Sequence, residues 1–193
     1  MQKTFRKLGY FFLYALVILA FIYLGTKDYN LVTYATDGER FNGDYNEIPR
    51  NNPFVYLNST ELIELLNNGS GIVFMGNKEN IWSKSYAKYL YEIASSLGLK
   101  EIYYYDVKKV KLLKNRNYYN IINALEGKLI ETDDSVNNLF SPSLYILKDG
   151  EVVFYDNTTA VVNNDLEVDT YWDSSNIYKF KEKIITAINE NDW

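Results

Sequence analysis

The chain contains no cysteine and no histidine among its 193 residues. Without cysteine it can form no disulfide and can carry out no thiol redox chemistry. Without histidine it lacks the usual general base at neutral pH and cannot build the Ser-His or Cys-His pairs of common hydrolases. Any metal site would need carboxylates alone as ligands. These two absences exclude the most familiar catalytic and metal centres.

The distribution of charge gives no indication of a nucleic-acid partner. The formal net charge is −5, and lysine and arginine residues are interspersed with acidic ones along the chain. Nucleic-acid-binding domains normally concentrate basic residues on one face. We therefore expect no nucleic-acid partner. The apolar content of 47% is ordinary for a folded protein, and the length leaves room for one domain with a proper core.

The N-terminal part of the sequence predicts a membrane anchor. Residues 8–25 form an apolar run without a charged residue, with Lys3, Arg6 and Lys7 before it and Lys27 after it. Eighteen helical residues span about 27 Å, which is just enough for a bilayer core. The excess of positive charge before the run predicts a cytoplasmic N-terminus over residues 1–7, a transmembrane anchor over residues 8–26, and a soluble domain outside the cytoplasm. A cleaved signal peptide is the alternative, although no clear A-x-A cleavage site follows the run.

The rest of the sequence predicts a linker followed by alternating strands and helices. Residues 27–53 are predicted to be a linker, because Gly38, Gly43, Pro49 and Pro53 interrupt any sustained periodicity. From residue 54 the apolar spacing predicts an α/β domain. Strands are expected at residues 54–57, 72–75, 101–106, 143–147 and 152–155, and helices at 60–67, 81–97, 112–125 and from 174 or 175 to about 189.

Two segments carry a resemblance to a known family. Residues 80–84, Asn-Ile-Trp-Ser-Lys, follow a predicted strand and turn and begin a predicted helix, and they resemble the C-x-x-C-K/R segment of the thioredoxin superfamily. Residues 140–153, FSPSLYILKDGEVV, resemble the V-P-T-L-x-x-x-K-D-G-x-x-V segment of that superfamily. The predicted order β-α-β-α-β-α-β-β-α is also the thioredoxin order. The insert between Asp106 and Ser141 and the predicted anchor look most like Gram-positive thioredoxin-like proteins of the bacteriocin-transport accessory type, which normally keep C-x-x-C.

This resemblance implies a fold and a binding groove. The implied fold is a thioredoxin-like central mixed sheet flanked by helices over residues 54–193, with Pro142 as a cis-proline beside the active-site turn. Asn80 and Ser83 occupy the positions of the two cysteines, so the implied protein is redox-inactive and needs no cofactor. By the same resemblance, Asn80, Ile81, Trp82, Ser83, Ser141 and Pro142 would form the floor of a groove that binds an extended polypeptide. The expected partner is an extracytoplasmic protein or peptide, and the expected role is that of an accessory or assembly factor for an export or cell-surface system.

Several alternatives remain open at this point. Asn80 and Ser83 can equally be plain helix-capping residues, the turn can support an enzyme of non-thiol chemistry, and the domain can be a structural spacer. The acidic residues Glu131, Asp133 and Asp134 lack the spacing of a calcium-binding loop, so we expect no metal site. The basic residues Lys108, Lys109, Lys111 and Lys114 form either a solvated helix start or a contact for anionic lipid or wall polymers.

Overall fold

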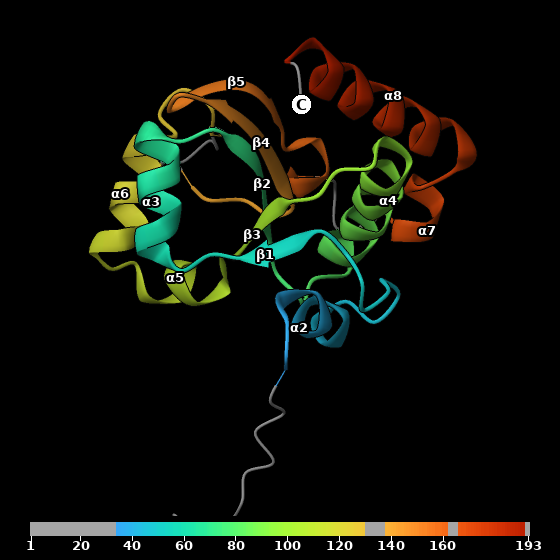
Figure 1. Ribbon diagram of the computed structural model, residues 1–193, viewed down its shortest axis with the longest axis horizontal. Helices are drawn as coiled ribbons and strands as arrows, with labels where there is room; N and C mark the ends of the chain where they lie inside the picture. Colours follow the sequence, from blue (N-terminus) through green and yellow to red (C-terminus); the bar gives the residue numbers. More distant parts are fainter. Residues whose placement is uncertain (1–33, 130–137, 162–165, 192–193) are drawn as a thin grey trace, which may run out of the picture. The chain divides into compact units, whose positions relative to one another are not determined.

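A five-stranded mixed sheet forms the centre of the folded domain in a computed structural model, which describes residues 34–129, 138–161 and 166–191 (Figure 1). The strand order is β1-β3-β2-β4-β5. β1, β3 and β2 are parallel to one another, and β4 and β5 form an antiparallel pair beside β2. The strands are β1 (Phe54–Tyr56), β2 (Gly71–Gly76), β3 (Ile102–Asp106), β4 (Ser143–Lys148) and β5 (Glu151–Asp156). The α/β fold class and all five predicted strands are confirmed, with boundaries that differ by one residue.

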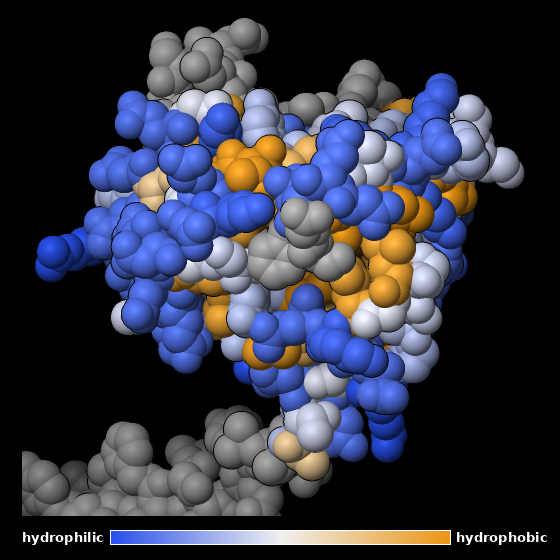
Figure 2. All heavy atoms as spheres, turned by 45° about the horizontal axis from the view of Figure 1, so that its top comes forward, coloured by the Kyte–Doolittle hydropathy of each residue, from blue (hydrophilic) through white to orange (hydrophobic). Residues whose placement is uncertain are grey.

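The central strand β2 is buried on both faces, because helices cover both sides of the sheet (Figure 1). Ile72 and Phe74 belong to one apolar core, and the alternate residues Val73 and Met75 belong to the other. The first core contains α4 (Ile81–Leu97) and α8 (Ser174–Glu190), and the second contains α3 (Ser59–Asn68) and α6 (Arg116–Ala124). On the face shown in Figure 2, hydrophilic residues cover most of the described surface, with apolar residues in smaller patches between them.

Local signals fix the ends of these elements. Asn58 caps α3 by accepting hydrogen bonds from the backbone of Thr60 and Glu61, and the Glu61 carboxylate accepts one from the Asn58 N–H in return. The turn between β4 and β5 has positive φ at Asp149 (51°) and Gly150 (81°), as its Lys-Asp-Gly sequence predicts. Residue type at these positions therefore accounts for the cap of α3 and for the turn between β4 and β5.

The predicted helix over residues 112–125 is instead two helices. α5 covers Lys108–Leu113, and α6 begins after Asn115. Lys114 has φ 42° and ends α5, while the Asn115 side chain accepts hydrogen bonds from the N–H groups of Asn117 and Tyr118 and so starts α6. Short helical turns, η1 (Thr158–Val161) and α7 (Val168–Tyr171), also occur in the stretch between β5 and α8.

The predicted linker over residues 27–53 is wrong in its second half. Residues 35–193 form one compact unit, and α2 (Asp37–Asp44) packs on β1 within it. Thr36 caps α2 by accepting from the Glu39 N–H at 3.2 Å, and Glu39 accepts from the Ala35 N–H at 3.0 Å. Thr36 and Glu39 have the spacing of a capping box in the sequence, but neighbouring glycines and prolines obscured this signal, and in the structure Glu39 reaches Ala35 in place of the cap residue.

Aromatic packing holds this segment on the domain. Phe41 is fully buried and stacks on Phe54 and Tyr45, with ring centroids 3.9 and 4.4 Å away. Tyr45 and Ile48 are also buried. Gly38 allows the close approach of the following loop, because a Cβ there would lie 2.5 Å from the Arg50 carbonyl oxygen. The domain therefore begins near residue 35 and not at residue 54.

The predicted cytoplasmic segment 1–7 and transmembrane anchor 8–26 lie outside the described residues. Within the described ranges, no helix combines the length and the apolar character needed to cross a bilayer.

We expect Phe41→Ala to lower the free energy of unfolding by about 3–5 kcal/mol, because the substitution leaves a cavity between α2 and β1. Urea denaturation followed by circular dichroism measures the change. Ile81→Ala is the control, since Ile81 is 61% exposed, and its effect should stay within about 0.5 kcal/mol. Equal effects of the two substitutions would show that α2 is not part of the core.

Candidate functional site

The turn between β2 and α4 is closed by its own polar side chains. Asn80 caps α4, because its side-chain oxygen accepts a hydrogen bond from the Ser83 N–H at 2.9 Å. Asn77 makes a second local bond, in which its side-chain oxygen accepts from the Glu79 N–H at 3.0 Å. The amide side chains of this turn thus satisfy backbone donors that would otherwise be left unpaired.

Ser83 is fully buried, although it occupies the position that the family resemblance assigns to a reactive thiol. Its hydroxyl oxygen accepts a hydrogen bond from the Asn77 N–H at 3.1 Å. The side chain therefore ties the first turn of α4 to the residue that follows β2. A buried hydroxyl used in this way is a structural group and is not placed to attack a substrate.

The two apolar residues of the turn have different environments. Ile81 is 61% exposed, and Trp82 is half-buried against Tyr171 of α7, with ring centroids 5.4 Å apart in an edge-to-face arrangement. Trp82 thus presents part of its ring to solvent at the start of α4. Such a half-covered aromatic side chain is a common anchor for a bound polypeptide.

Ser141 and Pro142 lie beside this turn. β2 and β4 are antiparallel, with Met75 opposite Ser143, so the end of β2 and the beginning of β4 meet at the same edge of the sheet. The Ser141–Pro142 peptide bond is cis, as the resemblance implied. Pro142 is buried and Ser141 is half-buried. The β2–α4 turn and the Ser141–Pro142 segment therefore follow and precede neighbouring strands at the same edge of the sheet.

The backbone of Ser141 is available for an additional partner. Among the hydrogen bonds of the described residues, none involves the Ser141 N–H or carbonyl oxygen. The neighbouring residues are satisfied locally, since the Ser143 hydroxyl donates to the Phe140 carbonyl oxygen at 2.8 Å. An unpaired, partly exposed backbone segment next to a strand can accept an added strand.

Sequence reasoning missed a polar cluster at the same edge of the sheet. The Asp44 carboxylate accepts a hydrogen bond from the Tyr56 hydroxyl at 2.6 Å and forms an ion pair with Lys78 at 2.8 Å. Burial and the bond to Asp44 hold the pKa of Tyr56 well above its usual range, and the same carboxylate raises the pKa of Lys78. The cluster was missed because Asp44 lies in the segment that the sequence analysis assigned to a linker.

A second carboxylate, Asp156, is buried at the end of β5. It accepts hydrogen bonds from the hydroxyls of Tyr86 and Thr158 at 2.9 and 2.7 Å, and it pairs with the Lys183 ammonium at 2.5 Å. Burial, followed by the charge of Asp156, raises the pKa of the fully buried Tyr86 well above its usual range. The charge of Asp156 is therefore compensated within the protein, and these contacts fasten α4 and α8 to the sheet.

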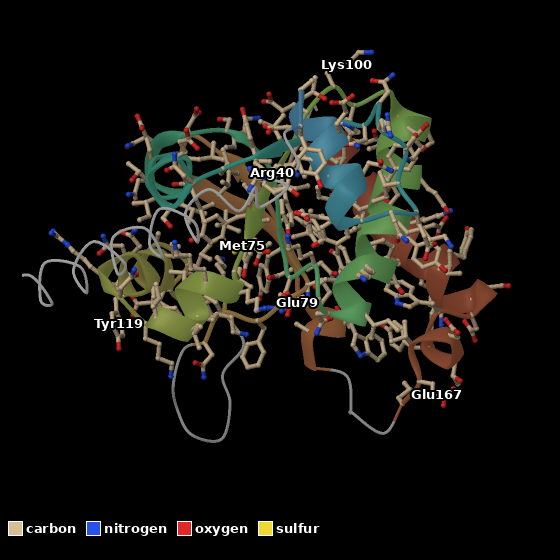
Figure 3. All side chains as sticks on the ribbon, turned by 90° about the horizontal axis from the view of Figure 1, so that it is seen from below. Arg40, Met75, Glu79, Lys100, Tyr119 and Glu167 are labelled. Carbon is tan, nitrogen blue, oxygen red and sulfur yellow. The ribbon has the colours of Figure 1, made fainter. Side chains whose placement is uncertain are left out.

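A cleft of about 860 Å³ opens at the carboxyl ends of β1 and β3, between α2, the start of α3 and α5. Ligands of α/β sheets commonly bind at this end of the strands. Arg40 and Glu79 lie near this part of the molecule when it is viewed from below (Figure 3), and Glu79 forms an ion pair with Lys108 of the cleft lining.

The carboxylates that line the cleft serve the fold. Each accepts a hydrogen bond from a backbone N–H group: Asp37 from Tyr56, Glu61 from Asn58 and Asp106 from Lys108. Burial raises the pKa of Asp106 above its usual range, although the Lys108 N–H opposes this shift. No carboxylate of the cleft is paired with a hydroxyl nucleophile in the described part of the chain, so the cleft offers polar contacts without an evident reaction centre.

No group of three or more acidic side chains within the described ranges is arranged to hold a metal ion. The acidic residues at positions 131, 133 and 134 lie outside those ranges.

When the chain is compared with protein-family models, with curated proteins and with solved structures, nothing matches it.

Removing the Ser83 hydroxyl should destabilise the domain. Ser83→Ala leaves the Asn77 N–H without its partner, so we expect the free energy of unfolding to fall by about 1–3 kcal/mol. Ser85→Ala is a matched control on the same helix, where the hydroxyl makes no hydrogen bond among the described residues and the effect should stay within about 0.5 kcal/mol. Denaturant titration measures both. If the two variants unfold at the same urea concentration, the structural role assigned to Ser83 is wrong.

The raised pKa of Asp106 gives a prediction for pH. A carboxyl whose pKa is higher in the folded state stabilises folding fully below its unfolded pKa, and this contribution is lost as pH rises through the folded pKa. Asp106→Asn removes the charge and keeps an oxygen for the Lys108 N–H. The variant should therefore gain stability relative to the parent protein as pH rises from 4 towards 7.

Urea denaturation at several pH values from 4 to 7 measures the stability of Asp106→Asn relative to the parent protein. Asp169→Asn, on the exposed side of α7, is the control, and its effect should not follow the same trend. If Asp106→Asn instead loses stability relative to the parent protein as the pH rises, the prediction is wrong.

Proposed function

We propose that this chain is a membrane-anchored, thioredoxin-like protein without redox activity, whose domain lies outside the cytoplasm and binds an extended polypeptide segment. In this role it acts as an accessory or assembly factor for an export or cell-surface system. The observation that carries the proposal is the unpaired backbone of Ser141 just before β4, at the edge of the sheet where the neighbouring strand β2 leads to the half-covered ring of Trp82.

Three features of the fold support the thioredoxin-like relationship. From β1 onward the strands and helices follow the expected order, with the region between β3 and β4 divided into α5 and α6. The three parallel strands are followed by an antiparallel pair, in the order β1-β3-β2-β4-β5. The turn after the central strand β2 leads directly into the long helix α4.

The polar groups of the turn support a binding role over a catalytic one at this position. Thiol chemistry needs a thiolate stabilised at a helix N-terminus, and the chain has no thiol. Asn80 and Ser83 are both used in hydrogen bonds that hold the turn together. An enzyme of other chemistry that uses Ser83 would need this hydroxyl exposed and paired with a base, and it is buried without one.

A polypeptide would bind at this edge chiefly through its backbone. Its N–H and C=O groups would pair with those of Ser141, and one of its apolar side chains would contact Trp82 and the exposed Ile81. The proposed anchor over residues 8–26 would keep the domain at the membrane surface, where exported polypeptides emerge.

A photo-crosslinking amino acid at position 81 tests this proposal in membranes that contain the full chain. We expect one discrete polypeptide adduct, which is not formed when the same amino acid replaces Tyr178, an exposed residue on α8. Ser141→Pro removes the backbone donor, and Trp82→Ala removes the aromatic contact. Each should reduce the adduct by about five- to thirtyfold, because a backbone hydrogen bond or an aromatic anchor contributes about 1–2 kcal/mol to binding.

Two conservative variants serve as controls. Ser141→Ala keeps the N–H group and Trp82→Phe keeps a ring against Tyr171, so both should retain most of the adduct. Identical adducts from positions 81 and 178, or an adduct that survives both Ser141→Pro and Trp82→Ala, would show that the partner does not use this groove.

A further inference from the structure

The segment from Lys108 to Arg116 concentrates positive charge in a protein whose net charge is −5. Its nine residues include five basic ones and no acidic one: Lys108, Lys109, Lys111, Lys114 and Arg116. They form α5 and the start of α6, and we call residues 108–119 the α5 corner.

Apolar side chains project from the same corner into solvent. Leu112 is 80% exposed, which is more than any other large apolar side chain in the described ranges, and Leu113 and Tyr119 are each 54% exposed. Figure 3 shows Tyr119 at the outer side of α6. Val110 of the same helix is 4% exposed and already supplies the contact with the core. Leu112 and Leu113 are therefore not needed to hold α5 on the domain.

Most of the basic groups of the corner are not neutralised by the protein. In the part of the chain that the structure describes, Lys109, Lys114 and Arg116 have no carboxylate partner. Lys108 pairs with Glu79. Lys111 lies over the Phe140 ring at 5.6 Å, and burial lowers its pKa. The corner therefore combines exposed leucines with three basic residues that have no carboxylate partner among the described residues.

We propose that the α5 corner binds the surface of an anionic phospholipid bilayer. Leu112 and Leu113 would enter the interface between headgroups and acyl chains, while Lys109, Lys114 and Arg116 would lie beside the lipid phosphates. Long basic side chains suit this arrangement, because their apolar stems can lie along the interface while their charged ends remain among the headgroups. A soluble polyanion would pair with the cations and leave both leucines in water. A bilayer accommodates both kinds of side chain.

This surface is separate from the proposed polypeptide groove. The α5 corner continues from the core that contains α3 and α6, whereas Trp82 packs on the core that contains α4 and α8. The corner could therefore lie on a membrane while the groove remains open. The inference does not depend on the polypeptide-binding proposal, and either can fail alone.

The absence of cysteine makes a direct test possible. Leu112→Cys in the full chain gives a single attachment point for an environment-sensitive fluorophore, and the exposed position should tolerate the label. The labelled protein is studied with vesicles of phosphatidylcholine alone and with vesicles that also contain phosphatidylglycerol. Because the label reports its own surroundings, the result does not depend on how residues 8–26 associate with the vesicle. Tyr178→Cys, labelled in the same way, is the control for an exposed site on α8.

We expect a blue shift of the label at position 112, and quenching by spin-labelled lipid, only with the vesicles that contain phosphatidylglycerol. Lys109→Gln and Lys114→Gln should each lower the ratio of protein with a docked corner to protein with an undocked corner by about fivefold. This change corresponds to about 1 kcal/mol per lysine. Raising the salt concentration should release the corner.

Three results would overturn the proposal. The first is a label at position 112 that stays in water with both kinds of vesicle. The second is a shift at position 112 that is equal with both kinds of vesicle, or that the label at position 178 shows to the same extent. The third is a full shift produced by soluble polyglutamate without vesicles, which would indicate an acidic polypeptide as the partner.

Discussion

Burial of β2 on both of its faces is the constraint on which the rest of this structure depends. All six residues of the strand are buried, with Ile72 and Phe74 in one core and Val73 and Met75 in the other. A strand without a solvent face needs a neighbour on each side and a helical layer above and below. β3 and β4 supply the neighbours, and two pairs of helices supply the layers. The turn that leaves β2 is consequently held at the edge of the sheet where β4 begins.

The polar residues at this edge mainly complete the fold. Asn80 and Ser83 close the turn, Asp44 joins α2 to β1 and Lys78, and Asp156 joins α4 and α8 to β5. Removing a hydroxyl or carboxylate that satisfies buried donors lowers the stability of the fold. A group held in such bonds is also poorly placed to act on a substrate. Among the described residues that are open to solvent, the backbone of Ser141 and the basic, leucine-bearing corner of α5 are left without partners of these kinds. Both are suited to contact with another surface.

Sequence reasoning succeeded where the pattern was local or strongly periodic. The apolar run of β2, the helix from Ile81 to Leu97 and the strands on either side of the Lys-Asp-Gly turn all appear as expected. It failed where a long-range contact outweighs a local signal. Phe41 and Tyr45 lie among glycines, asparagines and prolines, yet stacking on Phe54 makes their segment part of the core. A second failure is local, because the apolar periodicity from Leu112 hides the helix break that Lys114 and Asn115 produce.

The sequence by itself determined the α/β class, the five strands, and the absence of thiol and imidazole chemistry. These follow from residue type and spacing alone. Only the tertiary structure decided that Ser83 faces inward, that the domain begins near residue 35, and that the Ser141 backbone is left unpaired. It also decided that Leu112 faces solvent while Val110 faces the core. The reason is that burial and hydrogen-bond pairing depend on residues far apart in the chain, which local spacing cannot place.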